Sequence, residues 1–352
     1  MDFRTFTDTM KDIIKDSLPD DYKDAKVEIY QHQKLNEQYT GLSVRREDQR
    51  VTPTVNMESL YKEYNREGRS ISDMAKEVAK MIQMEPPGLD INRLLDYEKA
   101  KESLYIRVSN AEQNQDMLEN APHMLYEDLA VTYHIAAQMD EDGLASTLVT
   151  DNLLAQYGIT QEQLHEDAMK NAPQILPARV ESMGEVMRRM MRSDMLSSGM
   201  DEETMEAMLE DMAMVDDTPM TVVSNDRGVN GASALFYPGQ LDVIAEKLEG
   251  DFFILPSSIH ESLVVPDDGN FSYHELQNMV EEVNSTQVHP SERLSDEVYH
   301  YDSKDRVFEK AASFEKRQQE KANMKATAKQ KEAEHGEAPK APKKHQSNDM
   351  SL

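Results

Sequence analysis

The stretch from Asn230 to Gly269, NGASALFYPGQLDVIAEKLEGDFFILPSSIHESLVVPDDG, is the densest run of apolar and turn-forming residues in the chain. Proline and glycine interrupt it where short apolar segments end, as they do at turns between regular elements. We expect these segments to form the buried centre of the fold, with the polar residues among them acting as scaffolding. They are predicted to be a strand at 232–237, a helix at 241–248, a strand at 252–255 and a strand at 259–265.

Outside this stretch, the periodicity of apolar residues also mixes helices with strands. The sequence therefore predicts an α+β fold with antiparallel or mixed sheets and packed helices. A Met-rich helical hairpin is expected as an insertion, and a disordered tail is expected at the C-terminus. The main candidates are a helix at 3–14, a helix with Ser70 or Ser72 as its cap and Met74, Val78, Met81 and Ile82 facing inward, paired strands at 26–31 and 39–46, and a strand at 125–137.

Shifts in composition divide the chain into five parts. Two α+β portions come before a segment rich in methionine, and a third α+β portion comes after it. The last part is low in complexity and consists mostly of Lys, Ala, Glu and Gln. The predicted boundaries are 1–88 for the N-terminal portion, 89–182 for the middle portion, 183–220 for the Met-rich segment, 221–303 for the C-terminal portion and 304–352 for the tail.

The composition also limits the class of protein. The 352 residues include no cysteine, which excludes disulfides and thiolate metal sites and favours a reducing, cytoplasmic location. No segment reaches the roughly 18 uninterrupted apolar residues that cross a bilayer, so we expect a soluble protein. The sequence has no phosphate loop, no dinucleotide fingerprint and no paired-histidine zinc helix, so we expect neither a cofactor nor a metal.

The net charge of −29 disfavours binding to nucleic acid or to anionic membranes, because the surface repels phosphate groups. The charge is uneven along the chain. Residues 304–352 hold 12 Lys and Arg against 8 Asp and Glu, which leaves the first 303 residues at −33. The same charge raises one alternative, in which the acidic body mimics nucleic acid and occupies a DNA-binding protein.

The segment from Met183 to Met220 holds 11 of the 24 methionines, many at the three-and-four spacing of a helix face. One interpretation is a pair of helices whose methionines complete a loosely specified core, because Met fills irregular gaps. The other is an adaptable surface for a helix of a partner protein. The candidate partner-binding residues are Met187, Met190, Met191, Met205, Met208 and Met212.

The segment PSSIHES brings Ser257, Ser258, His260 and Glu261 close together in sequence. A hydrolase would need a serine hydroxyl, an imidazole and a carboxylate that converge in space. On a strand, however, His260 and Glu261 point to opposite faces, which argues against a simple dyad. His134, in a strand pattern, is expected to be a buried histidine bonded to a neighbour.

Several segments resemble a bacterial domain family of unknown function, found in gut Gram-positive bacteria and often near integrative, conjugative elements. The resemblance spans about residues 1–302 and implies no activity, cofactor or site. The Met-rich segment and the tail depart from it. The matching segments are ESLYKEY from Glu58, PHMLYEDLAVTY from Pro122, TLVTDNLLAQYGITQEQLHEDAMKNAP from Thr147, the stretch from Asn230 to Gly269, and VNSTQVHPSERLSDEVYHYD from Val283.

Taken together, these features predict a non-catalytic, acidic, cytoplasmic protein that acts through contacts with a protein partner whose identity the sequence does not give. The alternatives are a hydrolase of unfamiliar type that uses PSSIHES, and the acidic mimic of nucleic acid.

Overall fold

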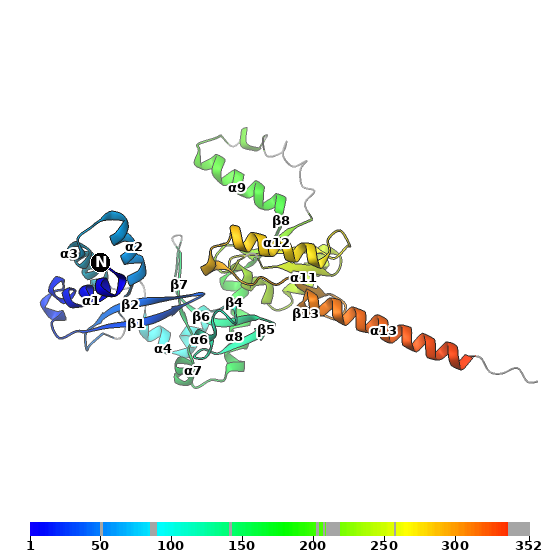
Figure 1. The fold of residues 1–352 in the computed structure, drawn as a ribbon, viewed down its shortest axis with the longest axis horizontal. Coiled ribbons are helices and arrows are strands. Elements are labelled where there is room, and N and C mark those ends of the chain that lie inside the picture. The colour runs from blue at the N-terminus through cyan, green and yellow to red at the C-terminus, as the bar shows by residue number, and fades with distance from the viewer. Residues whose placement is uncertain are drawn as a thin grey trace, which may run out of the picture.

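The structure is a computed structural model that describes residues 1–49, 52–84, 90–140, 143–201, 204–206, 208, 219–256 and 258–336. Helices surround three sheets, and every strand pairing in the described chain is antiparallel. The predicted α+β class is therefore confirmed. Figure 1 shows the N-terminal helices and strands at one end of the molecule, and the long last helix projecting from the other end.

The N-terminal portion packs three helices against a three-stranded sheet and has its own apolar core. Phe6, Met10, Leu42 and Met74 are fully buried in that core. The Ser70 side chain accepts a hydrogen bond from the backbone N–H of Asp73, so the predicted cap of the third helix is confirmed. The elements are α1 (Phe3–Ile13), β1 (Lys26–Lys34), β2 (Glu37–Arg45), β3 (Thr54–Asn56), α2 (Met57–Glu67) and α3 (Ile71–Gln83).

The middle portion is built around one long strand, β6, with β4 paired along one edge and both β5 and β7 along the other. The predicted strand at 125–137 is wrong in one respect, because a turn at Glu127 and Asp128 splits it into β5 and β6. The elements are α4 (Ile91–Leu95), α5 (Tyr97–Ala100), β4 (Leu104–Asn110), α6 (Gln115–Leu118), β5 (His123–Tyr126), β6 (Leu129–Asp140), β7 (Gly143–Leu148), α7 (Asp151–Tyr157) and α8 (Gln161–Ile175).

The remaining strands form a six-stranded sheet in the order β13-β12-β10-β11-β9-β8. Side chains alternate across it: Phe253 and Leu255 face the apolar side chains of α12, while Phe252 and Ile254 join the core shared with the middle portion. The elements are β8 (Ala178–Ser182), β9 (Thr221–Asn225), the 3-10 helix η5 (Gly231–Phe236), α11 (Gln240–Leu248), β10 (Phe252–Leu255), β11 (Ser262–Pro266), α12 (Tyr273–Thr286), β12 (Tyr299–Asp302) and β13 (Val307–Lys310).

The stretch from Asn230 to Gly269 lies in the core as expected, but its first element is not the predicted strand. Residues 231–236 form η5, and all six are buried. Asn230, with φ +53°, turns the chain, and its carbonyl accepts a hydrogen bond from the Ser233 hydroxyl at 2.7 Å. The predicted helix and the strand at 252–255 are confirmed as α11 and β10, while the last strand begins later than predicted, at Ser262.

The sheet continues past residue 303, where the sequence predicted the tail to begin. Strand β13 pairs with β12, and the helix α13 (Ala311–Gly336) follows it directly. Arg317 anchors the first turns of α13, because its guanidinium contacts the carboxylates of Asp302, Asp305 and Glu309. Beyond this anchor α13 extends away from the body (Figure 1). Residues 337–352, which belong to the predicted disordered tail, lie outside the described residues.

The tip of the β1–β2 hairpin holds the N-terminal portion against the rest of the chain. Asn36 adopts the left-handed conformation there, with φ +58°. Its backbone N–H donates to the Asn114 side chain at 2.7 Å, and its side-chain amide donates to the carbonyls of Ser291 and Arg293. One asparagine thus links three segments that are distant in sequence.

Candidate functional site

Helix α9 (Met183–Ser197) carries three of the six methionines that the sequence marks as partner-binding. The helix begins at a capping box formed by Ser182 and Glu185, a strong local signal for its start. None of its residues is buried. Met187 is 55% exposed and Met190 is 60% exposed. Figure 1 shows α9 on the outside of the six-stranded sheet, and no residue of the helix belongs to one of the apolar cores of the described chain.

The other candidate methionines differ in their surroundings. Met191 is half-buried, Met205 is buried, and Met208 is exposed. Met212 lies outside the described residues. An ion pair between Arg192 and Glu206 connects α9 to the helical residues that follow it. The described part of the Met-rich segment therefore combines one buried methionine with a mostly exposed helix.

A hollow of about 220 Å³ lies between α9 and the adjacent edge of the six-stranded sheet. Val186 and Met190 line it from α9, and Val222 lines it from β9. Glu181 on β8 bonds Arg179 and Arg189, each at 3.1 Å, and so ties the helix to the edge strand. These ion pairs fix the side of α9 that faces β8, which we call its near side. Met187 faces solvent.

The PSSIHES segment does not assemble a hydrolytic dyad from its described residues. The Ser258 hydroxyl oxygen accepts a hydrogen bond from the backbone N–H of His260 at 3.0 Å, which is a local turn contact. The His260 Nδ1 accepts from the backbone N–H of Asn230 at 3.2 Å, and Nε2 lies 3.8 Å from Glu292. The imidazole is therefore bonded to the loop before η5 and not to the serine. Ser257 lies outside the described residues, and Glu261 lines the hollow beneath α9.

His134 is buried within β6, and its Nε2 lies 3.1 Å from the Thr132 hydroxyl. This agrees with the predicted buried histidine bonded to a neighbour. Burial holds the pKa of His134 well below its usual value, and the positive charge of Arg107 adds to the effect. The imidazole is therefore neutral in the folded protein at neutral pH.

We expect this histidine to make the protein less stable in mild acid. Because the unfolded chain protonates near pH 6.5 and the folded chain does so at a lower pH, the free energy of unfolding falls as pH drops below about 6.5. His134→Gln should flatten that fall by up to about 1.4 kcal/mol per pH unit. Urea unfolding between pH 7 and 5 measures the slope. His274→Gln, at an exposed position, serves as the control. An unchanged slope in His134→Gln would contradict the prediction.

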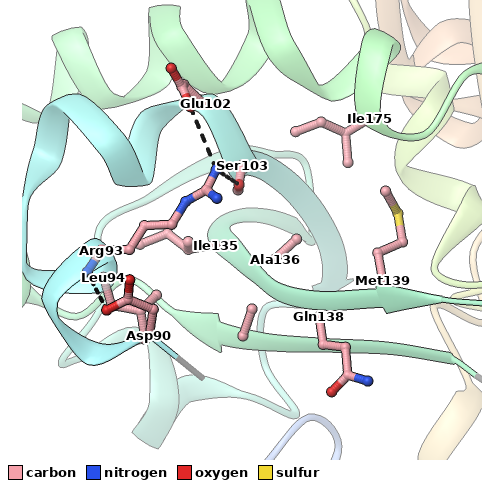
Figure 2. Close-up of a pocket in the computed structure, with 11 residues that line it drawn as sticks. Asp90, Arg93, Leu94, Glu102, Ser103, Ile135, Ala136, Gln138, Met139 and Ile175 are labelled. Atoms are coloured by element: carbon pink, nitrogen blue, oxygen red, sulfur yellow. Dashed lines mark hydrogen bonds and ion pairs between the residues drawn. The ribbon is translucent and has the colours of Figure 1, made fainter. Parts of the chain in front are cut away.

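A second hollow, of about 360 Å³, lies between α4, β6 and α8 (Figure 2). Its polar side chains are engaged with their own neighbours. Asp90 caps α4 by accepting from the N–H groups of Asn92 and Arg93. The Arg93 guanidinium turns toward Glu102 and Ser103, as Figure 2 shows. No reactive pair of groups converges among these residues.

In the described part of the chain, no group of three or more His, Asp or Glu side chains is arranged to hold a metal ion. Among the helices that the structure describes, none is long and apolar enough to cross a membrane.

Comparison with known proteins gives one match. A family model described as a family of unknown function, DUF5688, matches residues 3–303. The matched range includes the Met-rich segment, which the sequence had marked as a departure, and it ends before β13. Searches of curated proteins and of solved structures found no match. Because the match spans the three sheets apart from β13, the chain belongs to the DUF5688 family of unknown function.

Proposed function

We propose that the protein is non-catalytic and binds an amphipathic helix of a partner protein through the exposed side of α9. The single observation that carries this proposal is that α9 buries none of its residues although it presents Met187, Met190 and Leu196 to solvent. A helix in a folded protein is ordinarily stabilised by packing an apolar face, and α9 leaves such a face open.

The chemistry of the surface supports a helical partner. Met187 and Met190 are separated by about one helical turn, so they line one side of α9 as anchor positions in a helix-in-groove interface do. Methionine side chains are unbranched and polarizable, so they adapt to partners of different shape. The near side of α9 is held by Glu181. Met190 borders the hollow on that side but is still exposed, so Met187 and Met190 together form the accessible edge of the helix.

A matched pair of variants tests the proposal. Met187→Glu combined with Met190→Glu places charge in the proposed interface, and Met324→Glu does the same at a methionine on α13 that is 72% exposed. A photo-reactive amino acid at position 187 should cross-link one partner in native lysate, whereas one at 324 should not. The purified partner should then bind the double variant at least tenfold more weakly than wild type, and bind Met324→Glu normally.

Two outcomes would contradict the proposal. One is the absence of any specific cross-link at position 187. The other is equal weakening by the double variant and by Met324→Glu, which would point to a general charge effect. Far-ultraviolet circular dichroism of the variants confirms that each is folded before binding is compared.

We further propose that this interaction takes place in the bacterial cytoplasm and serves a mobile genetic element. Its support is the resemblance of the segments described above to a family with that context. Locating a tagged copy of the protein in fractionated cells tests the setting separately from the α9 interaction.

A further inference from the structure

A hollow of about 520 Å³ opens where three distant parts of the chain meet: the end of β5, the η5–α11 segment and the β12–β13 hairpin. This size falls within the usual range for small-molecule sites. The η5–α11 segment belongs to the stretch that organises the fold. The hollow is far in sequence from α9, and no residue of α9 lines it.

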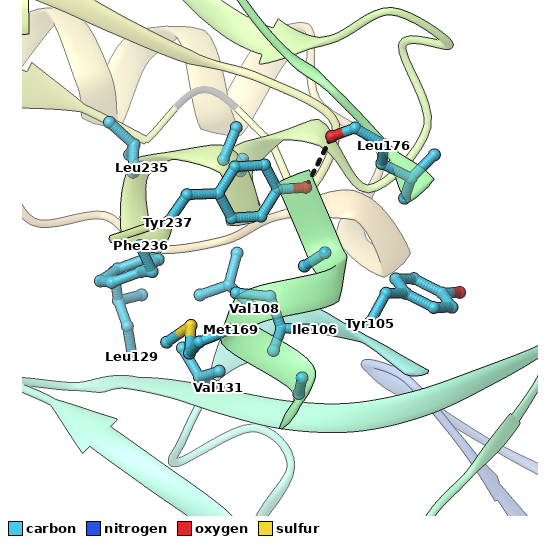
Figure 3. Packing of buried hydrophobic residues seen from close by; sticks show 14 of the residues in the cluster. Tyr105, Ile106, Val108, Leu129, Val131, Met169, Leu176, Leu235, Phe236 and Tyr237 are labelled. Atoms are coloured by element: carbon cyan, nitrogen blue, oxygen red, sulfur yellow. Dashed lines mark hydrogen bonds between the residues drawn. The ribbon is translucent and has the colours of Figure 1, made fainter. Parts of the chain in front are cut away.

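Three aromatic rings form its apolar wall. The ring centroids of Tyr126 and Phe236 are 4.8 Å apart, and those of Phe236 and Phe308 are 5.7 Å apart. Figure 3 shows Phe236 and Tyr237 diverging, with the Tyr237 hydroxyl reaching the Leu176 carbonyl at 2.9 Å. Tyr237 is thus committed to the core, while Phe236 links the rings of the wall. A wall of this kind suits a flat, apolar ligand.

The lining of the hollow includes one carboxylate, Asp242, whose Oδ1 oxygen already has two partners. The Tyr301 hydroxyl donates to Asp242 Oδ1 at 2.6 Å, and the Arg306 Nε lies 3.4 Å from the same oxygen. Burial and the bond to Asp242 raise the pKa of Tyr301 to about 12, so this hydroxyl keeps its proton at neutral pH. Asp242 therefore serves to position Tyr301 and Arg306.

Arg306 is the polar group left for a ligand. Its side chain is 73% exposed, and within the described residues its one ion pair is the Nε contact with Asp242. The two terminal nitrogens of the guanidinium remain available, and a guanidinium pairs with a carboxylate through two parallel hydrogen bonds. The contact between Arg306 Nε and Asp242 holds the two terminal nitrogens at the edge of the aromatic wall.

We propose that this aromatic pocket, formed by Tyr126, Phe236, Phe308, Asp242, Tyr301 and Arg306, binds a small aromatic carboxylate. The flat body of the ligand packs on the three rings, and its carboxylate pairs with Arg306. We expect an anion to be favoured over a cation, because Arg306 balances the charge of Asp242 through Oδ1 while keeping both terminal nitrogens for a ligand. The site goes beyond the proposed protein contact and is independent of it.

Three indole probes test the class of ligand: indole-3-propionate, which is anionic, indole, which is neutral, and tryptamine, which is cationic. Because the chain contains no tryptophan, the fluorescence anisotropy of each probe can be followed without a protein indole signal. Wild-type protein should bind indole-3-propionate with a Kd at least tenfold lower than that of tryptamine. Indole should fall between the two.

Two variants distinguish the contribution of the Arg306 charge to probe binding from that of the aromatic rings. Arg306→Gln should remove the preference for indole-3-propionate and leave indole binding unchanged. Tyr126→Ala should weaken all three probes, because each packs on the same wall. Arg4→Gln, at a side chain exposed on α1, is the matched charge control and should behave as wild type.

Each result supports or contradicts the proposal that the pocket binds a small aromatic carboxylate. A lost preference in Arg306→Gln, with normal behaviour of Arg4→Gln, supports it. Saturable binding that favours tryptamine, or equal affinity for the three probes, overturns the anionic class. The absence of saturable binding of any probe to wild-type protein overturns the site itself.

Discussion

Replacing Gly231 with alanine is expected to destabilise the protein by about 3 kcal/mol, the upper end of the usual range for overpacking a close-packed core. Gly231 is the first residue of η5 and is fully enclosed. A Cβ at this position would lie 2.1 Å from the Ser224 Oγ, 2.4 Å from the His260 carbonyl oxygen and 2.8 Å from the Asn225 backbone nitrogen. All three distances are too short for non-bonded atoms.

The surroundings of Gly231 cannot move aside cheaply. Two of the three contacts are backbone atoms, one at the end of β9 and one in the loop before β11, and these two strands pair directly with each other. The third atom, Ser224 Oγ, donates a hydrogen bond to the His260 carbonyl at 2.8 Å. Relief of the clash would therefore break that bond or shift paired strands, and either change costs free energy.

Gly250 provides a matched control from the same stretch of sequence. A Cβ there meets no atom within 4 Å. Urea unfolding followed by circular dichroism should give Gly250→Ala a free energy of unfolding within about 0.5 kcal/mol of wild type. If both alanine variants unfold at the same urea concentration as wild type, the packing described around η5 is wrong.

Local signals in the sequence were enough to predict many elements. Ser70 caps α3, and the alternating residues around Asn36 form the β1–β2 hairpin. The spacing of Leu241, Ile244 and Leu248 produced α11 as predicted. These elements depend on caps, turns and periodicity, which act over a few residues.

The predictions that failed depended on distant contacts. Residues 232–237 are apolar enough for a strand, yet they form η5 because Asn230 turns the chain and the segment packs against β9. Strand β13 contains Val307 and Phe308 amid charged residues, and its pairing partner β12 stabilises it. Neither outcome is encoded in local periodicity, since each requires a neighbouring element to be in place.

The candidate sites also combine features that local sequence predicts with features that depend on distant contacts. Helical spacing marked Met187 and Met190 correctly as members of a helix, but the spacing is identical for a buried and an exposed face. The rings of the aromatic pocket come from positions 126, 236 and 308, so no motif could have joined them. Conversely, Ser258 and His260 are close in sequence, but the Ser258 hydroxyl oxygen accepts from the His260 backbone N–H and not from its imidazole.

Asp128→Ala is expected to cost about 3 kcal/mol of unfolding free energy, because it removes the acceptor for three groups at once. The Asp128 carboxylate, 15% exposed, accepts from the Ser295 hydroxyl at 2.8 Å and the Tyr299 hydroxyl at 2.9 Å, and it lies 3.3 Å from the Lys310 ammonium. Tyr299 is fully buried, so its hydroxyl would lose its acceptor where water cannot replace it. Urea unfolding measures the loss, and Asp128→Asn, which keeps an acceptor oxygen, should lose about half as much.

A double-mutant cycle distinguishes this network from a simple loss of packing. If the Tyr299 hydroxyl matters through Asp128, then Tyr299→Phe should cost about 1 kcal/mol in wild type and close to nothing in Asp128→Ala, where its acceptor is already gone. Strictly additive losses would show that the two residues act independently. Asp128 lies in the turn between β5 and β6, whereas Tyr299 and Lys310 lie on β12 and β13. This carboxylate joins the middle sheet to the six-stranded sheet, but the two sheets also share one apolar core. Probes in both sheets should therefore report the same lowered urea midpoint in Asp128→Ala.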